Sequence, residues 1–205
     1  MADELVAASR NGYYRRVQVL LERGVDVDGG QYGSPLQAAA SNGKEAVVKL
    51  LLENGASVIA QGGEYGNALQ AAAYGGNEAV VGLLFEKGAG VNAQGGKYGN
   101  ALQAAAYKGN EAVVNLLLEK GADVNAQGGK YGNALQAAAY KGMKAEVVNL
   151  LLEKGADVNA QGGQYGNALQ AAAYKRNEAV VRLLLEKGAD VNAQGGQYGN
   201  ALQAA

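Results

Sequence analysis

The sequence predicts an all-α solenoid in which helix pairs stack in one direction and are joined by extended, β-hairpin-like loops. The first observation is a repeated phrase, Tyr-Gly-Asn-Ala-Leu-Gln-Ala-Ala, whose copies begin at Tyr65, Tyr98, Tyr131, Tyr165 and Tyr198, with a Tyr-Gly-Ser-Pro variant at Tyr32. Successive copies begin 33, 33, 33, 34 and 33 residues apart. Such a period is typical of repeat proteins, whose units bury their apolar faces only by stacking on one another.

The second observation is the set of helix signals at the start of each repeat, here taken from the copy at residues 98–130. Asn100 and Gln103 have the spacing of a capping box, in which two side chains satisfy the amides left unpaired at a helix start. We therefore expect a first helix from Ala101 to about Tyr107. Gly109 supplies the left-handed residue that ends it.

A second helix is expected from Glu111 to Lys120, with Asn110 as its cap and Gly121 as its end. Its acidic start and basic end both suit the helix dipole. Its apolar residues fall at helical spacing and form one face. They are Val113, Val114, Leu116, Leu117 and Leu118. The following residues, 122–130, form the connecting loop.

These signals divide the chain into a single domain of stacked units covering residues 1–205. We assign an N-terminal cap unit (1–31), full repeats (32–64, 65–97, 98–130, 131–164 and 165–197) and a truncated half repeat (198–205). The glutamines at the start of the first helices, Gln70, Gln103, Gln136 and Gln170, are expected to form an amide ladder that holds the units in register.

Two repeats depart from the pattern. The segment 142–147 carries one residue more than its counterpart, and we place the extra residue in the turn between the helices, because inside a helix it would rotate the apolar face by about 100°. Arg176 occupies the position that Gly109 occupies in the repeat at residues 98–130. If Arg176 keeps the left-handed conformation, the cost is on the order of 1 kcal/mol.

The two ends also differ from the inner units. Arg10, Asn11, Arg15 and Arg16 give the first unit the polar face that a capping unit requires. At the other end, residues 201–205 are expected to cover only part of the apolar face around Val181, Leu184 and Leu185. We therefore expect weak end-to-end self-association of the chain through this end.

Composition excludes most enzyme classes. The chain has no Cys and no His, so it lacks a thiol nucleophile, an imidazole base and the usual soft-metal ligands. We expect no catalytic residue, no metal site and no cofactor. With 18 Lys and Arg against 19 Asp and Glu, the chain has none of the basic excess of nucleic-acid binders. No apolar run is long enough to span a membrane.

Two repeated motifs resemble ligand-binding sites, but a structural role explains each of them better. The Gln-Gly-Gly-Lys-Tyr-Gly loop lacks the Ser or Thr that follows Gly-Lys in a phosphate-binding loop, and it recurs in many units. Asp123, Asp157 and Asp190 could be imagined as calcium ligands, but they lack the alternating acidic ligands of a calcium loop. A turn in which these side chains bond local backbone amides is the favoured interpretation.

The repeat resembles the ankyrin repeat family. The family opens its first helix with Thr-Pro-Leu-His, and here Ser34-Pro35-Leu36-Gln37 and Asn-Ala-Leu-Gln stand in its place. The family's Val-Val-x-Leu-Leu-Leu-x-x-Gly-Ala-Asp-Val-Asn run is present from Val113 to Asn125. The loops also look like those of ankyrin arrays in fungal NOD-like receptor proteins. The resemblance implies a non-enzymatic scaffold that binds a protein partner on its concave side.

On that expectation, the residues at the ends of the first helices form the candidate surface. Stacking would align the helix-end tyrosines into a ladder on the concave side, which either binds a partner or only packs ring on ring. The candidate partner-binding residues are Tyr74, Tyr107, Tyr140, Tyr174, Lys108, Lys141, Lys175, Glu64, Lys97 and Lys130. The loop tyrosines, Tyr65, Tyr98, Tyr131 and Tyr165, are expected to pack between loops.

Two other functions stay open at this stage. Near-identical units are also typical of an engineered or structural array without a natural partner, and the loop resemblance allows the ligand-sensing segment of a larger signalling receptor. The acidic N-terminus, Met1-Ala2-Asp3-Glu4, has no basic-then-apolar leader, so we expect a cytoplasmic protein.

Overall fold

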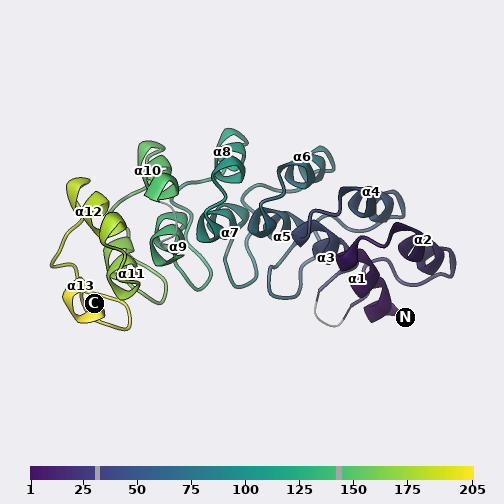
Figure 1. The fold of residues 1–205 in the computed structure, drawn as a ribbon, viewed down its shortest axis with the longest axis horizontal. Helices are drawn as coiled ribbons and strands as arrows, with labels where there is room; N and C mark the ends of the chain where they lie inside the picture. Colours follow the sequence, from purple (N-terminus) through teal and green to yellow (C-terminus); the bar gives the residue numbers. More distant parts are fainter. Residues whose placement is uncertain (31–32, 142–144) are drawn as a thin grey trace.

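The computed structural model describes residues 1–30, 33–141 and 145–205 as two rows of helices that curve into an arch (Figure 1). The inner row consists of α1 (Ala2–Asn11), α3 (Pro35–Ser41), α5 (Ala68–Gly75), α7 (Ala101–Lys108), α9 (Ala134–Lys141), α11 (Ala168–Tyr174) and α13 (Ala201–Ala204). The outer row consists of α2 (Tyr14–Glu22), α4 (Glu45–Glu53), α6 (Glu78–Glu86), α8 (Glu111–Glu119), α10 (Ala145–Glu153) and α12 (Glu178–Glu186). The inner helices and the loops line the concave side.

The predicted all-α helix-pair solenoid is therefore confirmed, and its core runs unbroken through the array. In α7, Ala104 and Ala105 are fully buried, and their small side chains let α5 and α9 pack closely on either side. In α8, Val114 and Leu117 are fully buried between the rows. Burying each Leu or Val stabilises the fold by roughly 1.5–3 kcal/mol. The unit boundaries stay a prediction, because helix pairs recur whichever residue is taken as the first.

A buried glutamine in each inner helix joins one unit to the next. The Oε1 atom of Gln103 accepts a hydrogen bond from the Asn100 amide at 2.7 Å, which completes the predicted capping box. Its Nε2 atom donates to the carbonyl oxygens of Ala126 (3.2 Å), Gly128 (3.3 Å) and Gly132 (2.6 Å) in the next loop. Gln37, Gln70, Gln136 and Gln170 make equivalent bonds. The glutamines thus set the register as expected, through backbone carbonyls of the next unit.

Each hairpin-like loop is closed by a single antiparallel bridge between two glycines. In the loop after α8, the Gly128 amide donates to the Gly132 carbonyl at 2.7 Å. Gly99, the counterpart of Gly132 in the preceding loop, has a φ of 97°, and an added Cβ would overlap Oε1 of Gln103. Glycine is required there both for the backbone conformation and for the space that the glutamine occupies.

The role expected of Asn110 as a side-chain cap is wrong. Its side chain makes no capping bond to α8, and its Nδ2 atom donates to the carbonyls of Ala73 (3.0 Å) and Tyr74 (3.2 Å) at the end of α5. The last carbonyls of a helix lack partners within the helix, so an amide from the next unit satisfies them. Asn77 bonds the Ala40 carbonyl in the same way.

The two irregular repeats keep the architecture. Arg176 has a φ of 54°, so it adopts the left-handed conformation that the sequence left open at this position. The extra residue predicted in the turn at 142–147 lies partly outside the described residues, because 142–144 are not described. The helices on either side, α9 and α10, match the lengths of α7 and α8.

The exposure of residues at both ends of the array matches what the sequence predicts, except at Leu184. Arg10, Asn11, Arg15 and Arg16 are exposed on the first unit. At the other end Leu184 is fully buried, contrary to expectation, and belongs to the core that includes α11, against which α12 packs. Leu185 is 43% exposed and Leu202 of α13 is 85% exposed. None of the described helices combines the length and the apolar character needed to cross a membrane.

The inter-unit role of the glutamines predicts a measurable loss on substitution. In Gln103→Ala, the Gly128 carbonyl loses the Gln103 donor and the Gly132 carbonyl keeps only the Gly128 amide, and a buried group left unpaired costs about 1–3 kcal/mol. We expect the free energy of unfolding, measured in urea, to fall by at least that amount.

The matched control is Gln203→Ala in α13. Gln203 is exposed and closes a capping box with Asn200, but within the described residues it makes no bond to a further loop. A loss equal to that of Gln103→Ala would show that capping, and not the link between units, is what matters.

Candidate functional site

The helix-end tyrosines and the loop tyrosines form one continuous stack along the concave side, which we name the tyrosine ladder. Tyr98 of a loop lies between Tyr74 and Tyr107 of the helix ends, with ring centroids 5.0 Å and 5.1 Å apart. The alternation continues through the array, with neighbouring centroids 4.6–5.2 Å apart. In chain order the rings are Tyr65, Tyr74, Tyr98, Tyr107, Tyr131, Tyr140, Tyr165, Tyr174 and Tyr198.

The two sets of rings differ in burial. Tyr98, Tyr131 and Tyr165 are 2–4% exposed and Tyr65 is half-buried. The loop rings stack on one another at 6.1–6.4 Å, so the predicted packing between loops is confirmed. The helix-end rings are half-buried along most of the row, and Tyr174 is 37% exposed. Stacked aromatic pairs contribute about 0.5–1.5 kcal/mol beyond their burial. The helix-end tyrosines therefore pack against neighbouring rings and also present a face to solvent.

Lysines lie over the half-buried rings. Lys108 places its Nζ atom 4.8 Å from the ring centre of Tyr74, in the preceding unit. Lys141 lies 5.5 Å from Tyr107, and Lys175 lies 4.4 Å from Tyr140. Each cation–π contact at an exposed site is worth about 0.5–1 kcal/mol. The row of lysines is thus held along the ladder, one charge for each of these units.

The loop tips form a second column beside the ladder. The amide of residue 97 donates to the carbonyl of residue 64 at 2.9 Å, and the same bond recurs from 130 to 97, from 164 to 130 and from 197 to 164. Side chains at these tips therefore stand next to each other. Lys97 pairs with Glu64 at 2.8 Å, Gln164 donates to Gln197 at 2.5 Å, and Lys130 lies 5.8 Å from the Tyr131 ring centre.

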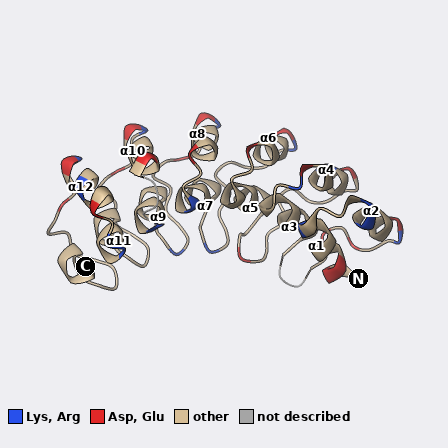
Figure 2. Ribbon diagram, in the orientation of Figure 1, with Lys and Arg blue, Asp and Glu red and all other residues tan. Residues whose placement is uncertain are grey.

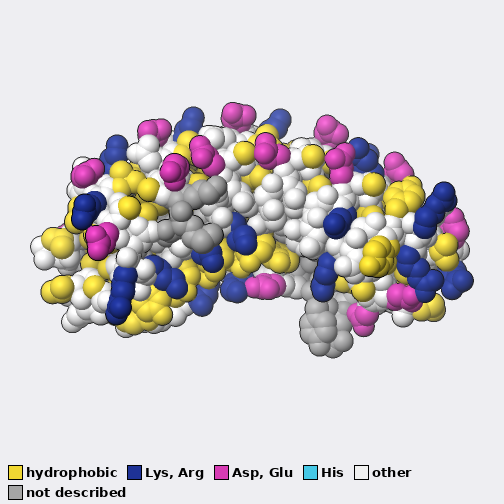
Figure 3. All heavy atoms as spheres, viewed as in Figure 1, with side chains coloured by type: hydrophobic (Ala, Val, Ile, Leu, Met, Phe, Trp, Pro, Cys, Tyr) yellow, Lys and Arg dark blue, Asp and Glu magenta, His cyan; other side chains and the backbone are white. Residues whose placement is uncertain are grey.

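Charge is separated between the two sides of the arch. Figure 2 shows red acidic residues on the outer helices α8, α10 and α12 and blue basic residues on α7 and α9, and Lys175 directly follows α11. Figure 3 shows yellow apolar and aromatic side chains with dark blue ones along the concave edge, whereas most acidic side chains stand on the opposite edge. The sequences of α5, α7, α9 and α11 contain no Asp or Glu.

Burial in the ladder shifts the acidity of its phenols. Desolvation, together with the neighbouring tyrosine hydroxyl, raises the pKa values of Tyr98, Tyr131 and Tyr165 well above 10.0. Hydrogen bonds to the Tyr165 hydroxyl and to Lys175 instead hold the pKa of Tyr140 below that value. These buried loop phenols are therefore uncharged at physiological pH, and the positive charge beside the ladder comes from the lysines.

The acidic turns considered as calcium sites have a structural role. The Oδ1 atoms of Asp123, Asp157 and Asp190 each accept a backbone amide two residues further on, at 2.8–2.9 Å, which confirms the turn interpretation. Asn125 bonds the Gly155 carbonyl and the Asp157 amide, and so links two units. Among the described residues, no group of three or more His, Cys, Asp or Glu could hold a metal ion.

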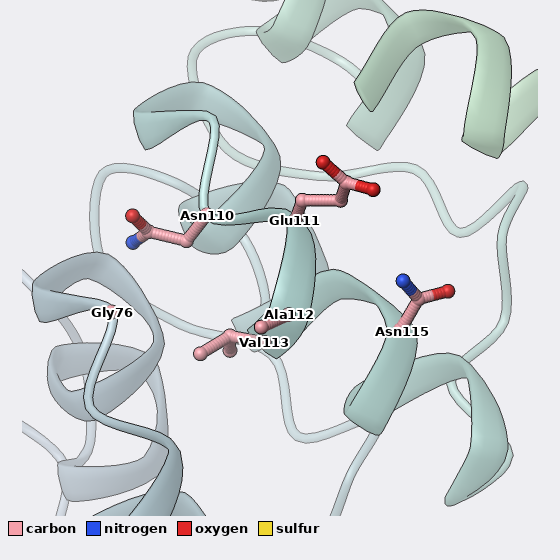
Figure 4. A pocket seen from close by; sticks show the side chains of 6 residues that line it. All are labelled: Gly76, Asn110, Glu111, Ala112, Val113 and Asn115. Atoms are coloured by element: carbon pink, nitrogen blue, oxygen red, sulfur yellow. The ribbon is translucent and has the colours of Figure 1, made fainter. Parts of the chain in front are cut away.

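A surface groove of about 470 Å³ lies at the start of α8 (Figure 4). Its polar side chains are Asn110, Glu111 and Asn115, and Figure 4 shows the Asn110 and Glu111 side chains pointing in opposite directions. The Asn110 amide already bonds the carbonyls of the preceding unit. A single carboxylate without a base or nucleophile partner has no arrangement for acid–base or covalent catalysis.

Two features of the site were not predicted from the sequence. The loop and helix-end tyrosines alternate along the chain at intervals of 9 and 24 or 25 residues, and the sequence does not show which rings meet, so their merging into one ladder becomes visible only in three dimensions. Ser41 stands at the ladder position in its unit, and a hollow of about 280 Å³ lies there beside Tyr65, with Arg10 at its edge. Aligning the repeats could have indicated this gap.

Comparisons with known proteins agree with this architecture. A family model described as "Ankyrin repeats (3 copies)" matches residues 5–62, 60–128 and 102–195. Among solved structures, the crystal structure of the human ASB11 ankyrin repeat domain is similar, with a TM-score of 0.81 and 28% sequence identity. The match covers 98% of this chain and 90% of that chain. No curated protein matches the sequence at a significant level.

The raised phenol pKa values predict a loss of stability in alkali. A tyrosine whose folded-state pKa lies above its unfolded value of 10.0 stabilises the fold fully below pH 10, and this contribution is lost as the pH rises further. Tyr140 acts in the opposite direction, but the raised groups outnumber it. We expect the free energy of unfolding in urea to fall above pH 10.

A variant with Tyr98, Tyr131 and Tyr165 replaced by Phe should lose less stability between pH 9 and pH 11, a range that brackets about one unit on either side of the ordinary phenol pKa. Tyr13→Phe, at an exposed position outside the ladder, is the control. If the free energy of unfolding falls equally in the triple Phe variant and in the unaltered protein, the loss of stability in alkali does not come from these three phenols.

Proposed function

Because the chain belongs to the ankyrin repeat family, we propose that it is a binding scaffold that holds a protein partner on the exposed side of its tyrosine ladder. Ankyrin repeats are generally protein–protein interaction modules, and their proteins are typically scaffolds without catalytic activity. The observation that carries the proposal is the ladder itself. It combines half-buried aromatic rings with lysines held above them on the concave side.

The physical properties of the ladder favour binding. Aromatic residues dominate binding energy at protein interfaces because they bury a large area at little cost in conformational freedom. The helix-end rings are fixed in place by their neighbours at 6.1–6.3 Å along the row, so little further ordering is needed when a partner arrives. We propose Tyr74, Tyr107, Tyr140, Tyr174, Lys108, Lys141 and Lys175 as the partner-binding residues of the helix ends.

Positions that vary between units would give the surface its specificity. Gly75 takes the place of Lys108 in the neighbouring unit, so the lysine row begins at α7. At the loop tips, Glu64, Lys97 and Lys130 are followed by glutamines at the equivalent positions. We propose that these tips form the second edge of the binding surface, where charge changes from unit to unit.

Substitution of the ladder tests the proposal. In a variant with Tyr107, Tyr140 and Tyr174 replaced by Ala, we expect capture of the partner from an extract of the source cell to be lost. Removing rings also unstacks the ladder, so a second variant replaces Lys108, Lys141 and Lys175 with Ala and keeps the rings. It should weaken capture without lowering the melting temperature by more than a few degrees.

The control for both variants is Lys49→Ala on the outer helix α4, where Lys49 pairs with Glu45 on the opposite side of the arch. Circular dichroism checks that each variant is folded. Undiminished capture by the folded Tyr variant would mean that the partner binds elsewhere.

We also propose weak self-association through the apolar surface formed by α12 and α13. Leu185, Val191 and Leu202 line a hollow of about 360 Å³ there, and the three side chains are 43%, 56% and 85% exposed. A second copy of the chain that covers this surface would remove apolar area from water.

Light scattering on a concentration series should therefore show association that Leu202→Lys reduces. The conservative control Leu202→Met keeps the position apolar and should leave association unchanged. A strict monomer at high concentration would contradict the proposal.

A further inference from the structure

The lysines on the ladder lack balancing charge, and this sets the chemistry of what can bind. Lys97 is paired with Glu64, but in the described part of the chain Lys108, Lys141 and Lys175 form no ion pair. Acidic residues of these units lie on the outer helices or in the turns after them. The chain as a whole carries a formal net charge of −1, so attraction for an anion is local to this strip.

We propose that the strip formed by Lys108, Lys141 and Lys175 binds an extended acidic segment of a partner protein, with a carboxylate at every second residue. This inference rests on the proposed function, since it describes the partner of the same surface. It adds the conformation, the charge and the spacing of the segment that fits.

The spacing comes from the ladder. The rings of Tyr74, Tyr107 and Tyr140, over which the three lysines lie, are 6.3 Å and 6.2 Å apart. In an extended chain, side chains of residues i and i+2 point to the same side and are about 6.6 Å apart. Over two steps the mismatch is about 1 Å, which flexible lysine side chains absorb. Carboxylates at positions i, i+2 and i+4 would thus each meet one lysine.

A helical acidic segment fits less well. Residues i and i+4 of an α-helix are about 6 Å apart along the axis, which matches the first step. Each such step also turns the side chain by about 40°, so residue i+8 points about 80° away from residue i. The third carboxylate would leave the lysine row, whereas alternate residues of an extended segment stay on one side.

The rings beneath the lysines strengthen the fit. Half-buried phenyl rings give the aliphatic parts of an acidic side chain an apolar surface to lie on, and the lysines above them are already held by cation–π contacts. Helices α7, α9 and α11 carry no carboxylate that would repel the segment. The acidic segment would lie over α7, α9 and α11, because α5 ends in Gly75 and carries no lysine.

Synthetic peptides test the inference. The probe is a fluorescent peptide with Glu at alternate positions, separated by Val or Thr. One comparison peptide has the same composition with its Glu residues adjacent, and another has Glu at every fourth position in a helix-forming, Ala-rich sequence. Fluorescence anisotropy at low salt should show the tightest binding for the alternating peptide, weakening as salt is raised.

The lysines are tested with a matched pair of variants. Replacing Lys108, Lys141 and Lys175 with Gln should weaken binding of the alternating peptide about tenfold, because three exposed ion pairs with the peptide are lost. Replacing Lys87, Lys120 and Lys154, which follow the outer helices, with Gln changes the net charge equally and should leave binding unchanged.

Three results would overturn the inference: equal binding of the alternating and adjacent-Glu peptides, tighter binding of the helical peptide, or an unchanged affinity in the Lys108, Lys141 and Lys175 variant. The proposed function is tested independently of this inference. If the cellular partner still needs the ladder tyrosines but is not displaced by the alternating peptide, the scaffold role stands and the acidic segment is wrong.

Discussion

The buried glutamine of each inner helix is the interaction on which the rest of the array depends. The same glutamine side chain closes the capping box of its own helix and donates hydrogen bonds to carbonyls of the next loop. A buried amide left without these partners would be costly, so each unit needs its neighbour in one register only. Gly99 and its counterparts leave room for this side chain. The result is a hairpin held at a fixed position beside the next inner helix.

The tyrosine ladder follows from that placement. Because the hairpins are fixed by the glutamines, Tyr98, Tyr131 and Tyr165 are each set between the helix-end tyrosines of two units. The loop rings are buried and the helix-end rings remain half-exposed. One set of stacked rings therefore stabilises the array and also forms its most distinctive surface. The candidate binding surface and the scaffold share the same side chains, which is why the lysines are the better place to separate binding from folding.

Charge separation across the arch has a similar origin. Helices α6, α8 and α12 begin with Glu and are followed by Lys, which suits the helix dipole, whereas the alanine-rich inner helices α7 and α9 carry a charge only at their last position. That position lies over the ladder, and lysine occupies it in α7 and α9 and directly follows α11. Cations are therefore concentrated on the concave side without any excess of positive charge in the chain.

The sequence by itself determined the period, the helix pairs and the capping boxes, because these depend on residues close together in the chain. It also gave the residues of the ladder, but as two separate rows. Only the tertiary structure decided that Asn110 bonds the preceding unit, that Leu184 is covered, and that loop and helix-end rings interleave. Each of these depends on atoms about one repeat apart, whose distance is set by the stacking of units and not by local propensity.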